Sequence, residues 1–180
     1  MSTRTLFKLL AIGVVGVLLS AGQASAACTG TSITPSSEVT STGTRCGGDS
    51  GDTASSNDTR EALCEVVSSG NSRLIHTWTF TSVPAGSLKI SREGYRLPGC
   101  DNDNFKFQVS YDYNDGNGPH FIFGSFCTIS SDSEGSLECN LSTTITDTAT
   151  VKIDLVDTVT TGSKTDLSSV HIDAISVCSE

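Results

Sequence analysis

Oxygen-bearing side chains are the first chemical feature of this sequence. Residues 101–104 read Asp-Asn-Asp-Asn and stand directly ahead of an alternating apolar stretch. Hard oxygen donors on a loop suit Ca²⁺, which takes about six to eight oxygen ligands in irregular geometry. The spacing is not that of an EF-hand, and a solvated acidic turn is the alternative. The sequence predicts a Ca²⁺ cofactor with candidate ligands Asp101, Asp103, Asp154, Asp157 and Asp173.

A second group of residues has the chemistry of sugar recognition. Aromatic rings pack against the apolar faces of pyranose rings, while neighbouring polar groups bind the hydroxyls. Three rings stand at expected turns or strand ends, two of them beside a polar run. The candidate ligand-binding residues are Tyr95, Tyr113, Asn114, Asp115, Asn117 and His120. For each of them an ordinary surface side chain is the alternative.

Catalytic motifs are weak in this sequence. Gly48-Asp49-Ser50-Gly51 matches the segment around the nucleophile of trypsin-like proteases. Those enzymes need a histidine base and a buried aspartate earlier in the chain, and no histidine precedes Ser50. We therefore expect a flexible turn at this position and a protein that is not an enzyme.

The start of the chain predicts export. Arg4 and Lys8 flank a short apolar run, and Ala24-Ser25-Ala26 ends it with small residues. This pattern is typical of a secretory signal peptide over residues 1–26. The predicted location is secreted, extracellular or at the cell surface, with the periplasm as an alternative. Lipidation of Cys28 is a further alternative.

The seven cysteines of an exported chain predict disulfides. Cys127 and Cys139 flank a polar turn and are expected to bridge a hairpin. The first and last strands of a sandwich are often neighbours, which favours Cys64–Cys178. Cys28–Cys46 would then pin the N-terminal segment and leave Cys100 unpaired. Six cysteines allow about 15 connectivities, so these pairs are hypotheses.

The overall charge limits the class of partner. The formal net charge is −9, and residues 1–26 contribute only basic residues, so the exported chain is more acidic still. An acidic surface argues against nucleic acid and anionic lipid as partners. The sequence has no second apolar stretch that would predict a membrane span.

Short alternating runs dominate the sequence after about residue 60. Residues 105–113 place apolar and aromatic side chains on one face and polar ones on the other, the period of a half-buried strand. Residues 74–80 alternate similarly, with Trp78 and a hydrogen-bonded His76 on the core face. Further strands are expected at 87–92, 121–129, 137–141, 148–156 and 169–178.

The elements together predict an all-β protein. Turn signals about every ten residues and the lack of a helical period indicate an antiparallel β-sandwich, with a jelly roll as the preferred topology. Residues 27–60 are rich in Ser, Thr and Gly and predict a flexible N-terminal arm. The sandwich domain is expected to cover residues 61–180.

Three blocks together resemble a known group of modules. They are residues 77–86 (from Thr-Trp-Thr-Phe to Val-Pro-Ala-Gly), 101–107 and 151–158, with Val170-His171-Ile172-Asp173 after the third. Their order resembles secreted bacterial C-terminal β-sandwich accessory modules of the carbohydrate-binding or galactose-binding-like type. The resemblance implies a non-catalytic module that binds a glycan or polysaccharide. It also implies a structural calcium near the last strand, where Asp173 is similar in position. The stretch 159–161 lacks the acidic residue and arginine that such modules carry there.

Two functions follow from the sequence. The first is a secreted, disulfide-stabilised module that binds carbohydrate, with calcium. The alternative is a structural or adhesive extracellular protein that acts through contacts with a protein partner.

Overall fold

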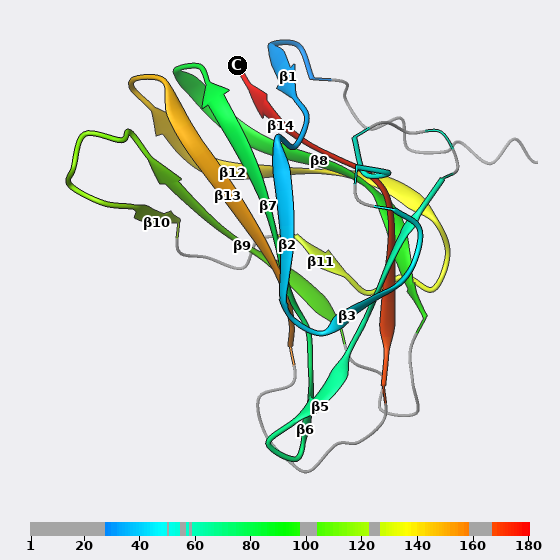
Figure 1. Cartoon of the computed structure of the whole chain (residues 1–180). Helices are drawn as coiled ribbons and strands as arrows, with labels where there is room; N and C mark the ends of the chain where they lie inside the picture. The colour runs from blue at the N-terminus through cyan, green and yellow to red at the C-terminus, as the bar shows by residue number, and fades with distance from the viewer. Residues whose placement is uncertain are drawn as a thin grey trace, which may run out of the picture.

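The computed structural model describes residues 28–49, 51–54, 57, 59–97, 104–122, 127–158 and 167–180. Within these ranges the chain forms strands and turns and no helix (Figure 1). The strands are β1 (Thr31–Ile33), β2 (Ser37–Thr42), β3 (Thr44–Gly47), β4 (Glu61–Cys64), β5 (Val66–Ser68), β6 (Asn71–Arg73), β7 (Ile75–Val83), β8 (Gly86–Leu97), β9 (Phe105–Asp112), β10 (His120–Ile122), β11 (Thr128–Ile129), β12 (Gly135–Ile145), β13 (Ala149–Asp157) and β14 (Ser169–Ser179). The described ranges contain no helix that is long and apolar enough to span a membrane.

Two antiparallel sheets form the body of the protein. Sheet 1 has the strand order β12-β8-β14-β4-β3, with β1 added beside β14. Sheet 2 has the order β10-β9-β13-β7-β2, with β11 added beside β9. From β4 onward the chain alternates between sheet 1 and sheet 2. As a result β4 pairs with β14 in sheet 1, and β7 pairs with β13 in sheet 2. This is the strand order of a jelly roll, as the sequence predicted.

The core lies between the two sheets. Strands β7, β9 and β13 of sheet 2 turn alternate side chains inward, among them Trp78, Phe105 and Phe107, which are at most 1 % exposed. Sheet 1 supplies the opposing aliphatic residues, such as Leu88 and Ile90. Burying each side chain of this size contributes about 1.5–3 kcal/mol, so this cluster supplies the main folding free energy. The predicted inward alternation of these strands is confirmed.

The segment predicted as a flexible arm is part of the sandwich. Strand β2 pairs with β7 at the edge of sheet 2, β3 pairs with β4, and β1 pairs with β14. These are edge strands whose backbone groups bond on one side while most side chains face solvent. A strand in that position needs few large apolar residues, which is why its composition resembled that of a loop.

The disulfides differ in part from the predicted pairs. The Cys127–Cys139 pair is confirmed, but it does not bridge a hairpin, because Cys139 lies on β12 of sheet 1 and Cys127 directly precedes β11 of sheet 2. The structure forms Cys28–Cys178 and Cys46–Cys64, so Cys28–Cys46 and Cys64–Cys178 are wrong. Strands β4 and β14 are neighbours, as expected. However, Cys64 lies opposite Ser169, and Cys178 is nine residues further along β14, about 30 Å away. Cys100 lies outside the described residues.

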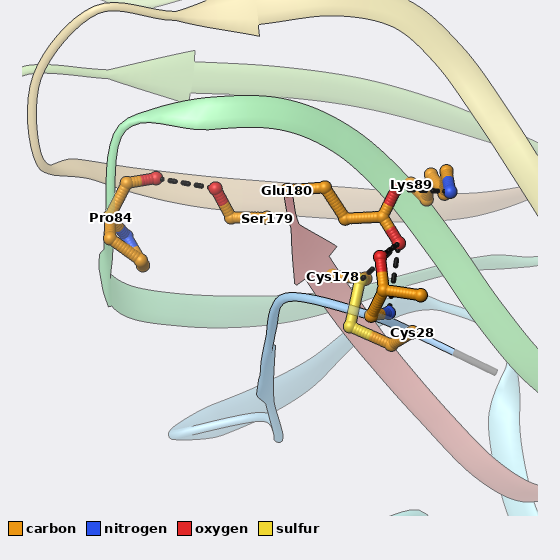
Figure 2. Close-up of a disulfide and its surroundings, with 7 residues drawn as sticks. Cys28, Pro84, Lys89, Cys178, Ser179 and Glu180 are labelled. Carbon is orange, nitrogen blue, oxygen red and sulfur yellow. Dashed lines mark hydrogen bonds and ion pairs between the residues drawn. A yellow bond between two sulfur atoms is a disulfide. The ribbon is translucent and has the colours of Figure 1, made fainter.

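The Cys28–Cys178 bridge lies at the end of β14 (Figure 2). Next to it, the Glu180 carboxylate accepts hydrogen bonds from the backbone N–H and the hydroxyl of Thr29, at 2.9 and 2.8 Å, and from Lys89. The Ser179 hydroxyl donates to the Pro84 carbonyl at 2.9 Å. These contacts hold β1 against β14 and β8 at one end of sheet 1.

Candidate functional site

A groove of about 610 Å³ runs over the outer face of sheet 2. The strand registers place its residues in rows across the sheet. In one row Phe121 of β10 lies opposite Ser110 of β9, then come Lys152 of β13 and Thr79 of β7. The lining residues are Val39, Thr77, Thr79, Ser110, Tyr111, Asp112, Asn114, Pro119, Phe121, Thr150, Lys152 and Asp154. Most of them carry a hydroxyl, an amide or a charge.

Phe121 is the large apolar side chain on the β10 side of the groove. It is 61 % exposed, whereas the core phenylalanines Phe105 and Phe107 are at most 1 % exposed. In the described part of sheet 2, β10 is an edge strand and pairs with β9. An exposed ring at the margin of a polar groove is suited to pack against the apolar face of a flat ligand.

The floor of the groove carries a carboxylate and an ammonium group on one strand. Asp154 and Lys152 are two residues apart on β13, so both side chains point to the outer face. The Thr77 hydroxyl donates to Asp154 Oδ1 at 2.5 Å and fixes that carboxylate. Lys152 is exposed and supplies donors beside it. Ligand hydroxyls would therefore find both acceptors and donors on the floor.

Among the predicted ligand-binding residues around the β9–β10 turn, Asn114 lines the groove, whereas Tyr113 packs against the core. The ring of His120 stacks on that of Tyr111, with centroids 5.0 Å apart, and Tyr113 lies 5.7 Å from His120. Hydrogen bonds with Thr146 lower the pKa of the Tyr113 phenol. Asn114 lines the groove and donates to the Thr150 hydroxyl at 3.3 Å.

The other predicted ligand-binding residues lie away from the groove. Asp115 and Asn117 bond to each other on the exposed turn, where Asn117 Nδ2 donates to Asp115 Oδ2 at 2.8 Å. Tyr95 belongs to β8 of sheet 1, where its ring stacks on His171 at 4.8 Å. The structure therefore does not bring Tyr95 together with the groove on sheet 2.

Asp173 is the predicted calcium ligand with the most suggestive surroundings. It is the extra residue of a bulge in β14, between Ile172 and Ala174, and it is 1 % exposed. A bulge redirects the side chain that it contains. Its Oδ1 accepts from the Asn57 N–H at 3.4 Å, while Oδ2 has no hydrogen-bond partner.

Two further carboxylates lie close to Asp173. One oxygen each of Glu93, Glu134 and Asp173 lie within 4.8 Å of one another. Arg60 donates to both oxygens of Glu134, at 2.9 and 2.6 Å, and holds that side chain in place. Ca²⁺ prefers oxygen ligands, and three carboxylates supply them here. One of these oxygens, Asp173 Oδ2, is buried and accepts no hydrogen bond from the described residues.

Asp157 and Asp154, the other predicted calcium ligands that the structure describes, do not join this group. Asp157 ends β13 in sheet 2, where its carboxylate lies 3.7 Å from Arg73, and Asp154 lies in the groove. Asp101 and Asp103 lie outside the described residues. Sequence reasoning did not single out Glu93 and Glu134, since only the register of β8 on the β14 bulge brings Glu93 to Asp173.

Phe121 and Lys152 were likewise not singled out from the sequence. Their alternation showed only that they belong to strands, and the register of three strands is needed to place them in one row. Tyr111 was expected in the core with Phe105 and Phe107. It is half-buried and packs against this core from the end of β9, where it also lines the groove.

Comparison with known proteins finds similarity in structure alone. No known sequence family and no curated protein matches the chain. Solved structures similar to it include TmCBM61 in complex with β-1,4-galactotriose, at 12 % identity and a TM-score of 0.41. The match covers 81 % of this chain and 90 % of that one.

Two further matches are of the same kind. The family 11 carbohydrate-binding module from Clostridium thermocellum, in complex with a β-1,3-1,4-mixed-linked tetrasaccharide, has 13 % identity and a TM-score of 0.34, over 83 % of this chain and 88 % of that one. Xylanase10C from Cellvibrio japonicus, in complex with xylopentaose, has 9 % identity and a TM-score of 0.46, over 79 % of this chain but 26 % of the enzyme. At these values the matches do not identify a function, which must be argued from the site.

Proposed function

We propose that this protein binds a polysaccharide or oligosaccharide in the groove on sheet 2. The observation that carries the proposal is the exposed ring of Phe121 in the same row as the hydroxyl and ammonium groups of the groove. A pyranose offers an apolar face to such a ring and its hydroxyls to polar neighbours. Lys152 supplies donors and Asp154 supplies an acceptor oxygen.

The dimensions of the groove favour an extended ligand. The row from β10 to β2 crosses five strands, which are about 4.8 Å apart, so it is about 19 Å long. The groove offers both polar and apolar surface along this row. Such a surface suits a short stretch of a glycan chain better than a compact apolar molecule.

The proposed role is binding without catalysis. Asp112 and Asp154 are the carboxylates that line the groove in the described chain. Asp112 lies opposite Thr150, and Asp154 is four residues further along β13, so the Cα atoms of the two aspartates are about 14 Å apart. Glycosidase carboxyl groups are about 5–9.5 Å apart, and the wider Cα separation of these two aspartates favours binding over hydrolysis.

Calcium and export are part of the same proposal. A Ca²⁺ ion held by Asp173, Glu93 and Glu134 would stabilise the β14 bulge in sheet 1 and would not touch the ligand in sheet 2. The three disulfides support a protein that works outside the reducing cytoplasm.

A glycan-array screen tests the proposal. The purified protein is applied once with calcium and once with a chelator, and a Phe121→Ala variant is applied in parallel. We expect binding to one class of glycan, lost in the variant and weakened by chelator only near the unfolding temperature. Absence of binding by the folded wild-type protein would contradict the proposal and favour the adhesive alternative, which pull-down with candidate surface proteins then addresses.

A further inference from the structure

A second cluster of ionisable side chains lies where the two sheets meet. Glu38 of β2 and His76 of β7 come from sheet 2, while Arg45 of β3 and Glu61 of β4 come from sheet 1. One oxygen of each glutamate and one nitrogen of His76 lie within 4.8 Å of one another. This cluster is separate from the sugar groove, whose lining does not include its members.

Two polar atoms in this cluster are buried without a hydrogen bond. Glu61 Oε2 and His76 Nε2 face each other at 3.9 Å, and both side chains are 0 % exposed. At that separation they do not bond to each other. Leaving a buried polar atom without a partner costs about 1–3 kcal/mol, so a shared ligand would relieve this cost at both atoms.

The other atoms of the two side chains are held in place. The Thr40 hydroxyl lies 2.8 Å from His76 Nδ1, which fixes the orientation of the ring. The Nε2 atom is left pointing at the carboxylate. Metal-bound histidines are oriented in the same way, by a hydrogen bond at the nitrogen that does not bind the metal.

Arg45 holds both glutamates. Its Nε donates to Glu61 Oε1 and its terminal nitrogen donates to Glu38 Oε1, each at 2.6 Å. These bonds occupy one oxygen of each carboxylate. Of the second oxygens, Glu38 Oε2 accepts a long hydrogen bond from the Thr53 hydroxyl at 3.4 Å, and Glu61 Oε2 accepts none from the described residues.

We propose that Glu38, Glu61 and His76 bind a divalent transition-metal ion, with Zn²⁺ as the representative. Imidazole nitrogen with carboxylate oxygens suits zinc and its neighbours, whereas Ca²⁺ prefers oxygen alone. In tetrahedral zinc sites the bond lengths of about 2.0–2.2 Å place an oxygen and a nitrogen about 3.4 Å apart. The observed 3.9 Å therefore requires the two atoms to approach by about half an ångström.

The site has a route from solvent. Glu38 lines a surface hollow of about 340 Å³, together with Thr53 and Gly51. The ion would approach through this hollow and complete its coordination with water. Because the ligands belong to β2 and β7 of sheet 2 and to β4 of sheet 1, the ion would join the two sheets and stabilise the sandwich.

Direct metal binding tests this inference without reference to carbohydrate. Protein without a histidine tag is titrated with Zn²⁺ by calorimetry and with Co²⁺ by visible absorption, in the presence of excess Ca²⁺. We expect one Zn²⁺ ion per chain, not displaced by Ca²⁺, and a Co²⁺ spectrum of low coordination number. No binding, or displacement by Ca²⁺, would overturn the proposal.

Variants locate the ion. His76→Gln and Glu38→Gln are each expected to weaken Zn²⁺ binding at least about tenfold. His171→Gln is the matched control, because His171 lies on sheet 1 beside Tyr95, outside the cluster, and its loss should leave affinity unchanged. Glu38→Gln keeps the size of a side chain that is 7 % exposed, so it provides the test if His76→Gln does not fold. Equal weakening by His171→Gln, or full affinity in Glu38→Gln, would contradict the assignment.

Discussion

Truncation of Phe121 separates binding from stability. A phenylalanine side chain presents about 200 Å² of surface, and at 61 % exposure about 120 Å² of it is open to a ligand. Stacking on a sugar would cover about half of that area, which at about 25 cal/mol per Å² is worth about 1.5 kcal/mol. Phe121→Ala should therefore weaken glycan binding about tenfold.

The same numbers limit the effect on folding. About 80 Å² of Phe121 is buried, so Phe121→Ala should lower the free energy of unfolding by at most about 2 kcal/mol. Affinity gel electrophoresis with β-glucan, galactan, xylan and mannan measures binding, and urea denaturation measures stability. Leu137→Ala is the matched control, since Leu137 is 41 % exposed but lies on β12 of sheet 1. Unchanged retardation of a folded Phe121→Ala protein, or equal loss in Leu137→Ala, would refute the assignment of the groove.

Three other perturbations have definite expected outcomes. The Cys28–Cys178 and Cys46–Cys64 bridges close loops of 150 and 18 residues. Replacing each pair with alanine should lower the free energy of unfolding, measured by urea denaturation, by up to about 5 kcal/mol for the first and about 3 kcal/mol for the second. A larger loss for the second bridge would contradict the loop-entropy argument. Hydrogen bonds from Lys89 and Thr29 lower the pKa of Glu180 from 4.5 to about 2. Glu180 should thus stabilise the fold fully above about pH 4.5 and lose that effect as the pH falls through about 2. The Tm difference between wild type and Glu180→Gln should therefore vanish below about pH 2. A Tm difference that does not change with pH would count against the ion pair. Calcium at a hundred times its Kd should raise the Tm of wild type by about 5–10 °C and leave Asp173→Asn unchanged, and an equal rise in both proteins would remove Asp173 from the site.

The sequence predicted the parts of this protein that depend on local alternation. The inward faces of residues 74–80 and 105–109 were recognisable because strand side chains alternate and the core needs large apolar residues. His76 was expected as a buried, hydrogen-bonded residue, and its bond with Thr40 confirms this. The jelly roll followed from the number of strands and the spacing of turns.

Features that depend on cross-strand register could not be obtained in the same way. The row that joins Phe121, Ser110 and Lys152 brings together residues up to about 40 positions apart, and no local pattern encodes that alignment. The disulfide error has the same origin, because neighbouring strands were expected correctly but not which ends of them meet. The polar composition of β2 hid an edge strand, whose few contacts make large apolar residues unnecessary.

The most direct test of the central claim is a residue-resolved map of ligand contact. Uniformly ¹⁵N-labelled protein is titrated with the glycan that it binds on the array, and amide shifts are followed in two-dimensional spectra. We predict the largest changes on the outer face of sheet 2, at Phe121, Lys152 and Thr79. Changes centred on Tyr95 and His171 of sheet 1, with sheet 2 unaffected, would contradict the account.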